Sequence, residues 1–221
     1  MRPKQNWRVP VSSKAYAALA AASVVGLLGG SLAYIYTQSS NDAFSECRQG
    51  QVGGGDIGGA FTLVDGTGKT VTDADVLTKP SLVYFGYTFC PDVCPMDNAR
   101  NAEAVDILEE QGFDVQPVFI SVDPARDTPE VVADFAENLH PKMIGLTGSD
   151  EQVKAASKAF KTYYKKQDGD EEFYLVDHST FTYLVLPGTG FVDFFRREDT
   201  ADQMAERTAC FISNSDDAMQ N

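Results

Sequence analysis

The chain has 221 residues, and its 32 acidic side chains outnumber its 18 Lys and Arg, which gives a formal net charge of −14 at pH 7. So acidic a chain is repelled by a phosphate backbone, which excludes nucleic acid as a natural partner. A hydrophobic content of 43% over this length is enough for one globular domain with a sizeable core, plus an appendage.

The N-terminal part of the chain contains an apolar segment. Residues 15–36 carry no charge and are rich in Ala, Leu, Val and Gly, and a helix of about 20 apolar residues crosses a hydrocarbon core of ~30 Å. Basic residues precede the segment, and no acidic residue occurs before Asp42. The positive-inside rule predicts a cytoplasmic tail over 1–14, a transmembrane anchor over 15–36 and an exported remainder. A cleavable signal peptide is the alternative, but its apolar core is usually shorter, ~7–15 residues.

The exported part is expected to begin with a linker and to continue as one folded domain. Residues 37–58 are polar and Gly-rich, which is typical of a flexible tether. The folded domain is expected over 59–214. Its hydrophobic pattern predicts a hairpin over 61–72, strands at 81–86, 115–122 and 143–147, helices at 95–110 and 150–163, a hairpin over 173–195 and a last helix. Strands that alternate with helices predict an α/β sandwich with extra hairpins.

Two cysteines lie between the strand at 81–86 and the helix that follows it. Cys90 is expected just ahead of this helix and Cys94 in its first turn, where free backbone N–H groups and the helix dipole favour reactive thiolates. Pro95 suits the first helical position. Such a pair can form a disulfide, attack one, or bind a thiophilic metal. Redox-active pairs more often have two intervening residues; the three here leave room for an ion but do not exclude a disulfide.

The chain has two histidines, so a site with an imidazole ligand must use His140 or His178. His140 precedes Pro141 at an expected helix end, where a capping or surface histidine is ordinary. His178 lies between two apolar runs, and by itself a histidine at such a turn is more often structural than a ligand. Two thiolates with one imidazole suit copper. Structural zinc usually takes four protein ligands from paired cysteine motifs, which this chain lacks.

Three separated motifs resemble the Sco/SenC family. They occur in order along the chain as Tyr84-Phe-Gly-Tyr-Thr-Phe-Cys-Pro-Asp-Val-Cys-Pro95, Phe119-Ile-Ser-Val-Asp-Pro-Ala-Arg-Asp-Thr-Pro129 and Val176-Asp-His-Ser179. The resemblance spans residues 58–195. It implies a membrane-anchored, thioredoxin-like protein that delivers copper during assembly of the binuclear copper centre of cytochrome c oxidase.

The resemblance also implies a ligand set and a setting. Cys90, Cys94 and His178 match the two thiolates and the imidazole that bind one copper ion in the family, as Cu(I), Cu(II) or both. The expected partners are the copper-binding subunit of the oxidase and a copper donor or thiol reductant in the periplasm. The expected location is a bacterial inner membrane rather than a mitochondrial one, with a single membrane span and the domain in the periplasm.

Three charged residues are candidates for supporting the site. Asp123 and Arg126 follow the strand at 115–122, at the sheet edge where α/β proteins place ligands. They could orient the cysteine loop, contact a partner, or serve only the local structure. Asp177, beside His178, could fix the tautomer of the imidazole, with ordinary turn chemistry as the alternative. Met96 is expected to pack rather than to bind metal.

The two remaining cysteines are Cys47, in the expected linker, and Cys210, in the expected last helix. In an oxidising compartment, two cysteines outside the reactive motif are expected to form a disulfide that ties the start of the domain to its end. A lipidated cysteine is the other interpretation of Cys47, but Phe44-Ser-Glu-Cys47 does not resemble a lipoprotein cleavage site.

Two classes of function follow from these features. The first is a metallochaperone, which captures copper with Cys90, Cys94 and His178 and passes it on. The second is a thiol:disulfide oxidoreductase, in which one of the two cysteines attacks a partner disulfide and the other resolves it. Such an enzyme could reduce the copper-binding cysteines of the target, or act in redox signalling. His178 distinguishes the two classes, because only copper binding needs it as a ligand. A thiol peroxidase is a third possibility, but its threonine-rich motif is not evident.

Overall fold

A computed structural model describes residues 13–39, 44–48, 57–170 and 173–218. The chain divides into two compact units, Met1–Ser45 and Glu46–Asn221, and each is described by itself. Most of the expected cytoplasmic tail and much of the expected linker lie outside the described residues. Within that linker, the second unit begins at Glu46.

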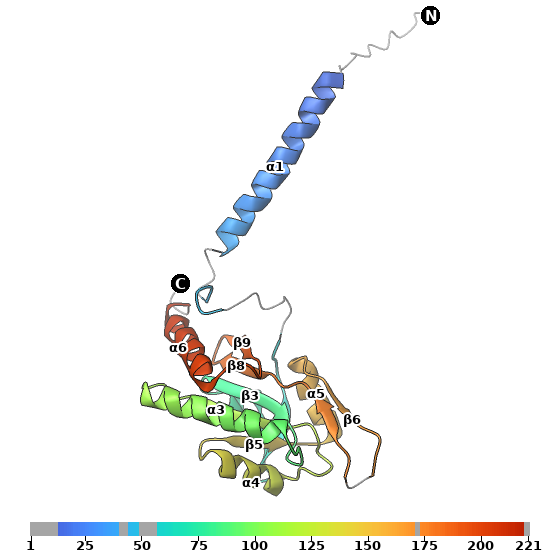
Figure 1. Cartoon of the computed structure of the whole chain (residues 1–221), viewed down its shortest axis with the longest axis vertical. Helices are drawn as coiled ribbons and strands as arrows, with labels where there is room; N and C mark the ends of the chain where they lie inside the picture. Colours follow the sequence, from blue (N-terminus) through green and yellow to red (C-terminus); the bar gives the residue numbers. More distant parts are fainter. Residues whose placement is uncertain (1–12, 40–43, 49–56, 171–172, 219–221) are drawn as a thin grey trace, which may run out of the picture. The chain divides into compact units, whose positions relative to one another are not determined.

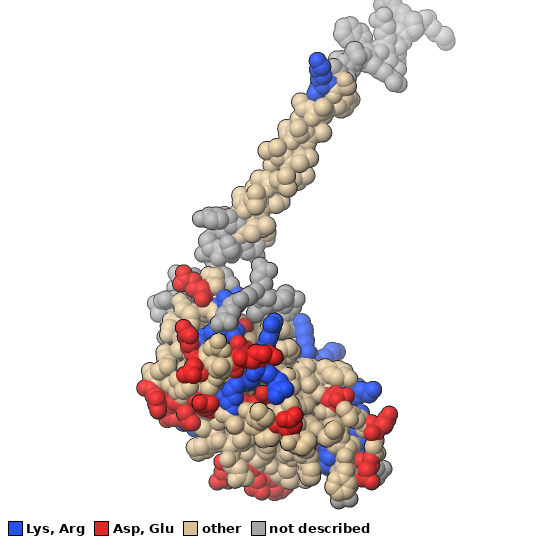
Figure 2. Space-filling view, in the orientation of Figure 1, with Lys and Arg blue, Asp and Glu red and all other residues tan. Residues whose placement is uncertain are grey.

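The first unit contains one long helix, α1 (Ser13–Ser39). Within it, Ser13–Ile35 is long and apolar enough to cross a membrane, as the apolar segment predicts. Lys14 is its one charged residue, and the face of the described helix that Figure 2 shows has no other charge. This unit is consistent with a membrane anchor.

The second unit alternates strands and helices around one main sheet (Figure 1). Its strands are β1 (Thr62–Asp65), β2 (Thr70–Thr72), β3 (Ser81–Gly86), β4 (Gln116–Ser121), β5 (Ile144–Thr147), β6 (Tyr164–Lys166), β7 (Val176–His178), β8 (Thr182–Leu186) and β9 (Gly190–Phe195). Its helices are α2 (Asp73–Val76), α3 (Val93–Glu110), α4 (Pro129–Leu139), α5 (Asp150–Ala159) and α6 (Ala201–Ala218).

The main sheet has seven strands in the order β2-β1-β5-β4-β3-β8-β9, and β6 pairs with β7 in a separate two-stranded sheet. The central strands β3, β4 and β5 are parallel neighbours. Right-handed crossovers through α3 and α4 place both helices on the same face of the sheet, and α3 also packs against α6. The predicted thioredoxin-like α/β fold, with extra hairpins, is confirmed.

Two stretches differ from their predicted structure. The hairpin expected over 173–195 is formed by β8 and β9 alone, because β7 pairs with β6. The helix expected over 150–163 ends at Ala159, and the next residues turn and form β6. Lys161 has a left-handed backbone with φ of 52°, which stops the helix, and the Ser157 hydroxyl donates to the Thr162 carbonyl across the turn. The buried Phe160 packs on Phe85, with ring centroids 5.3 Å apart. The hydrophobic pattern does not reveal this turn, because Phe160 remains in phase with the helix.

The core is built from the two faces of the central strands. Side chains alternate along a strand, so the register-paired Tyr84 and Phe119 share one face while Phe85 lies on the other. Phe119 packs on Phe135 of α4, with centroids 4.6 Å apart, and Phe85 packs on the opposite face against Phe160. This packing fixes the carboxyl ends of β3 and β4, the edge where α/β sheets usually place ligands.

Candidate metal centre

The two free cysteines lie where β3 passes into α3. The helix begins at Val93, two residues earlier than Pro95, so Cys94 is its second residue. The backbone N–H of Cys94 points to Cys90 Sγ, with N and Sγ 3.4 Å apart. Cys94 is fully buried, whereas 8% of Cys90 remains exposed. The loop therefore offers one sulfur near the surface and one beneath it.

His178, the last residue of β7, completes a compact group with these cysteines. Its Nε2 lies 3.3 Å from Cys94 Sγ, and the ligand atoms of Cys90, Cys94 and His178 all lie within 4.8 Å of one another. The imidazole Nδ1 lies 2.9 Å from the carbonyl oxygen of Ser179. Because a carbonyl can only accept, Nδ1 carries the proton, and the lone pair of Nε2 faces the sulfurs. Two sulfurs and one imidazole nitrogen form a ligand set suited to a soft metal ion.

The two sulfurs differ in their acidity. The pKa of Cys90 is lowered, because its thiolate accepts a hydrogen bond from the Cys94 thiol, with further help from backbone N–H groups. The pKa of Cys94 is raised by that same hydrogen bond and by burial. The expectation that both sulfurs are reactive is therefore met by Cys90 only. Without metal, the site holds one thiolate and one thiol.

Gly86, the last residue of β3, allows the Cys94 sulfur to lie against the strand. A Cβ at this position would lie 2.9 Å from Cys94 Sγ and 3.2 Å from the Phe119 ring. A larger residue would therefore displace the sulfur or the packing beneath it. Gly86 belongs to the first quoted motif, but its role depends on the path of α3 and is not evident from the sequence.

Asp123 and Arg126 lie beside the cysteine loop. Arg126 Nε is 2.6 Å from Asp123 Oδ2, and the Arg126 guanidinium lies over the ring of Phe89, 4.8 Å from its centroid. Phe89 directly precedes Cys90 in the chain. The pair thus contacts the cysteine loop through an aromatic ring, an arrangement that suits the loop-orienting role considered for it.

Asp177 does not take the role suggested for it. Its carboxylate accepts a hydrogen bond from Gln167 Nε2, with the two atoms 2.6 Å apart. Adjacent residues of a strand point to opposite faces, so Asp177 points away from the side where His178 faces the cysteines. The backbone carbonyl of Ser179, not Asp177, fixes the imidazole tautomer.

Asp127 supports the site, and sequence reasoning missed it. Its buried carboxylate accepts hydrogen bonds from the Thr88 backbone N–H and hydroxyl, at 3.0 and 2.5 Å, and from the Ser121 hydroxyl. Burial raises its pKa, although these hydrogen bonds oppose the shift. Asp127 therefore ties the cysteine loop to the end of β4. It lies within the second quoted motif, directly before Thr128, the N-cap of α4, and its bond to Thr88 spans 39 positions, so no local pattern reveals it.

His140 and Met96 do not belong to the three-ligand group. His140 is buried, accepts a hydrogen bond from the Lys142 backbone N–H at Nδ1, and places Nε2 3.2 Å from Asp106 Oδ1. It terminates α4, as a capping histidine does. Met96 is 61% exposed, because it lies on the outer side of the first turn of α3. The prediction that Met96 packs against other side chains is therefore wrong.

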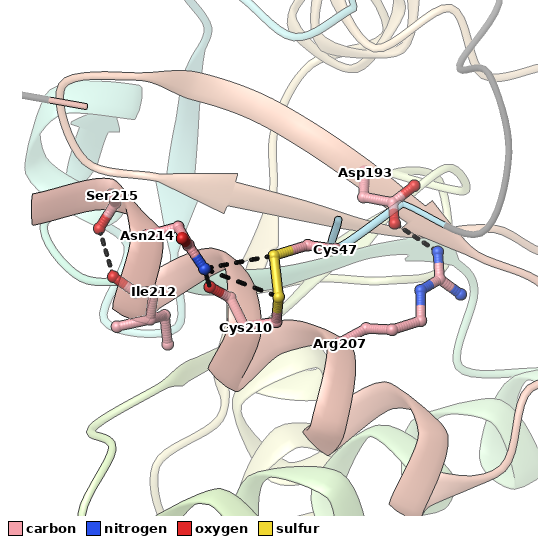
Figure 3. Close-up of a disulfide and its surroundings, with 7 residues drawn as sticks. All are labelled: Cys47, Asp193, Arg207, Cys210, Ile212, Asn214 and Ser215. Carbon is pink, nitrogen blue, oxygen red and sulfur yellow. Dashed lines mark hydrogen bonds and ion pairs between the residues drawn. A yellow bond between two sulfur atoms is a disulfide. The ribbon is translucent and has the colours of Figure 1, made fainter. Parts of the chain in front are cut away.

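Cys47 and Cys210 are joined by a disulfide, with their Cα atoms 5.6 Å apart. Figure 3 shows the bond against α6, where the Asn214 side-chain amide points to both sulfurs at 3.6 and 3.7 Å. The same amide donates to the Cys210 carbonyl at 2.9 Å. The bridge joins the start of the folded unit to its last helix, and it leaves Cys90 and Cys94 as the free cysteines.

Comparisons with known proteins agree with this geometry. The SCO1/SenC family model matches residues 49–213. Protein SenC of Rhodobacter capsulatus is 53% identical over 211 residues, which cover 95% of this chain and 94% of that protein. The structure of Arabidopsis thaliana ScoI with copper bound is similar, with a TM-score of 0.68, 41% identity, and coverage of 71% of this chain and 99% of that one. Bradyrhizobium japonicum ScoI with copper bound has a TM-score of 0.63 and 35% identity, and the match covers 69% of this chain and 98% of that one. This chain belongs to the SCO1/SenC family.

Proposed function

We propose that this chain is a copper metallochaperone for the binuclear copper centre of cytochrome c oxidase. The SCO1/SenC family is known for copper chaperones in oxidase assembly, and two of the similar structures hold copper. The observation that carries the proposal is the convergence of Cys90, Cys94 and His178, whose ligand atoms lie within 4.8 Å of one another. Two sulfurs and one imidazole form a three-coordinate site for Cu(I), and a further oxygen ligand makes it acceptable to Cu(II).

The difference between the two sulfurs suggests an order of capture and release. The more exposed Cys90 is already a thiolate, so an incoming Cu(I) ion meets it first. Binding to Cys94 then releases the thiol proton, because the metal ligand is the thiolate. Release to a partner runs in reverse, with Cys90 exchanging before the buried Cys94. One copper ion is bound per chain, and no bond in a substrate is made or broken.

A thiol:disulfide oxidoreductase is the second candidate, because the same geometry places a thiolate beside a thiol. In that reaction Cys90 attacks a disulfide of the target and forms a mixed disulfide, and one target thiolate leaves. Cys94 then displaces the second target thiolate. The products are a reduced target and a Cys90–Cys94 disulfide, which a thiol reductant must reduce before the next cycle. Such a reaction would prepare the target's copper-binding cysteines to accept metal, and it could also serve redox signalling.

The proposed setting is a bacterial inner membrane. Residues 1–14 would form a cytoplasmic tail, 15–36 the anchor, 37–58 a linker whose Cys47 is bridged to the last helix, and 59–214 the copper-binding domain in the periplasm. The basic residues before α1 support this orientation, and the Cys47–Cys210 disulfide favours an oxidising compartment. The proposed partners are the copper-binding subunit of the oxidase and a periplasmic copper donor or thiol reductant.

Anaerobic competition of the reduced full-length chain, in detergent, against a Cu(I) chelator tests the proposal. The expected result is one tightly bound ion per chain, with affinity clearly weakened in His178→Ala. His140→Ala is the matched control, since this second histidine lies outside the ligand group, and it should bind copper as the parent does. Weak copper binding that is unchanged in His178→Ala would overturn the chaperone proposal in favour of the oxidoreductase.

A further inference from the structure

Tyr174 connects the segment that carries His178 with the loop that follows β4. It precedes β7 by two residues and His178 by four, and it is 4% exposed. Its hydroxyl donates to Asp123 Oδ1, with the two oxygens 2.5 Å apart. This bond links the segment that carries His178 to the loop that follows β4.

The ring of Tyr174 also contacts two cations. The Arg126 guanidinium lies 3.7 Å and the Lys166 ammonium 3.6 Å from the ring centroid, distances at which a cation is attracted to an aromatic face. Arg126 extends the connection, because its guanidinium also lies over Phe89, next to Cys90. A continuous chain of contacts therefore runs from the histidine segment, through Tyr174 and Arg126, to the cysteine loop.

The strand that carries His178 does not pair with the main sheet. β7 pairs with β6 alone, over the three residue pairs Tyr164↔His178, Lys165↔Asp177 and Lys166↔Val176. An isolated two-stranded hairpin is marginally stable at best. The position of His178 must therefore be set by side-chain contacts to the rest of the domain.

Other contacts reach β7 directly, among them the ring of Tyr84 in β3, which stands edge-on to the imidazole with centroids 6.1 Å apart. The Tyr87 hydroxyl hydrogen-bonds the backbone of Val176, and the Tyr87 ring stands edge-on to the imidazole at 5.8 Å. These contacts act on β7 itself. Tyr174 instead lies in the segment that leads into β7, where its hydroxyl bonds Asp123 and its ring contacts Arg126 and Lys166.

We propose that Tyr174 is a positioning residue for the metal centre, which holds His178 over Cys90 and Cys94 by fastening the β6–β7 hairpin to Asp123 and Arg126. The inference rests on the proposed copper site and deepens it. A buried tyrosine that only filled the core would affect stability without acting through the imidazole. The two roles separate in a double-mutant cycle with His178.

The cycle uses the full-length chain in detergent and Cu(I) affinity from chelator competition. Tyr174→Leu removes both the hydroxyl bond and the aromatic face, and Tyr174→Phe removes the hydroxyl bond alone. Loss of a residue that orients a metal ligand typically weakens metal affinity about 10–100-fold. We expect about a tenfold loss for Tyr174→Leu and a smaller loss for Tyr174→Phe. In the His178→Ala background, neither change should weaken copper further.

The matched control is Tyr163→Leu, because this tyrosine directly precedes β6 but is 57% exposed; it should bind copper as the parent does. The Cu(II) form gives a second measurement. The nitrogen hyperfine signal of the imidazole in electron paramagnetic resonance should be lost or altered in Tyr174→Leu. If the leucine variant does not fold, Tyr174→Phe carries the test, since it retains the ring.

The outcomes distinguish the role of Tyr174 from the existence of the three-ligand site. Equal losses in the parent and His178→Ala backgrounds, or no loss in either, would overturn the role of Tyr174. No effect of His178→Ala itself would instead overturn the three-ligand site on which the inference rests.

Discussion

The two cysteine pairs of the domain have opposite surroundings. Cys90 and Cys94 are free and share contacts with each other and with His178. Cys47 and Cys210 lie 163 positions apart and are bonded to each other. Burial does not separate the pairs, because Cys47 is 4% and Cys90 8% exposed. The difference lies in the neighbours: a helix start, a thiol donor and an imidazole keep the first pair available to a ligand, whereas the second pair braces the fold.

Removing the bridged pair should give the largest change in stability. The Cys47→Ser, Cys210→Ser double variant loses a crosslink over 163 positions, and losing a native disulfide typically lowers the free energy of unfolding by about 2–5 kcal/mol. Denaturant unfolding of the full-length chain measures this loss. Copper affinity should stay at the parent value once the protein is folded. An equal fall in copper affinity would mean that the two pairs are not independent.

A substitution beside the free pair should lower the free energy of unfolding by a smaller amount and should also weaken copper binding. Gly86→Ala places a Cβ 2.9 Å from Cys94 Sγ, and overpacking of this kind typically costs about 1–3 kcal/mol. Unfolding and chelator competition on one preparation should show lower stability together with weaker copper binding. Gly169→Ala is the matched control, because its nearest neighbours would lie at 3.9 Å. Parent-like copper binding in Gly86→Ala would show that the sulfur can move freely.

The free pair should also show a distinctive pH dependence. Since the pKa of Cys90 is lowered and that of Cys94 is raised, iodoacetamide should modify one cysteine per metal-free reduced chain. The rate should remain high below the ordinary thiol pKa of about 8.5. In Cys94→Ala the donor is lost, so the rate profile should move to higher pH. Two equivalent sites that titrate near the ordinary value would contradict the assigned roles.

The same shift has a consequence for stability. The pKa of Cys90 is lower in the folded chain than in the unfolded one. Its thiolate therefore stabilises the fold above the ordinary thiol pKa, and this contribution disappears as the pH falls through the lowered value. The bridged cysteines do not titrate and contribute no such dependence.

Much of the fold was predictable from local patterns. The apolar segment predicts α1, and the alternation of strands and helices predicts the sandwich around β3 and α3. These features depend on hydrophobic periodicity, which the chain displays locally. The turn at Lys161 and the short strand β6 were not predictable, because a left-handed residue without glycine leaves no clear signal.

The site was predictable where a motif carries it and not where distant segments meet. The resemblance brings Cys90, Cys94 and His178 together, and the structure places their ligand atoms in one group. Asp127 and Tyr174 support this group through bonds that span 39 and 51 positions, which no local pattern records. Asp177 was wrongly predicted to fix the imidazole tautomer, because it and His178 are neighbours in a strand and point to opposite faces.

X-ray absorption at the copper edge tests the central claim most directly, using the Cu(I)-loaded full-length chain with Cys47 and Cys210 still bridged. The account predicts two sulfur neighbours and one nitrogen neighbour per copper ion, with the nitrogen lost in His178→Ala. A site with sulfur neighbours alone in the parent, or a nitrogen neighbour that persists in His178→Ala, would contradict it.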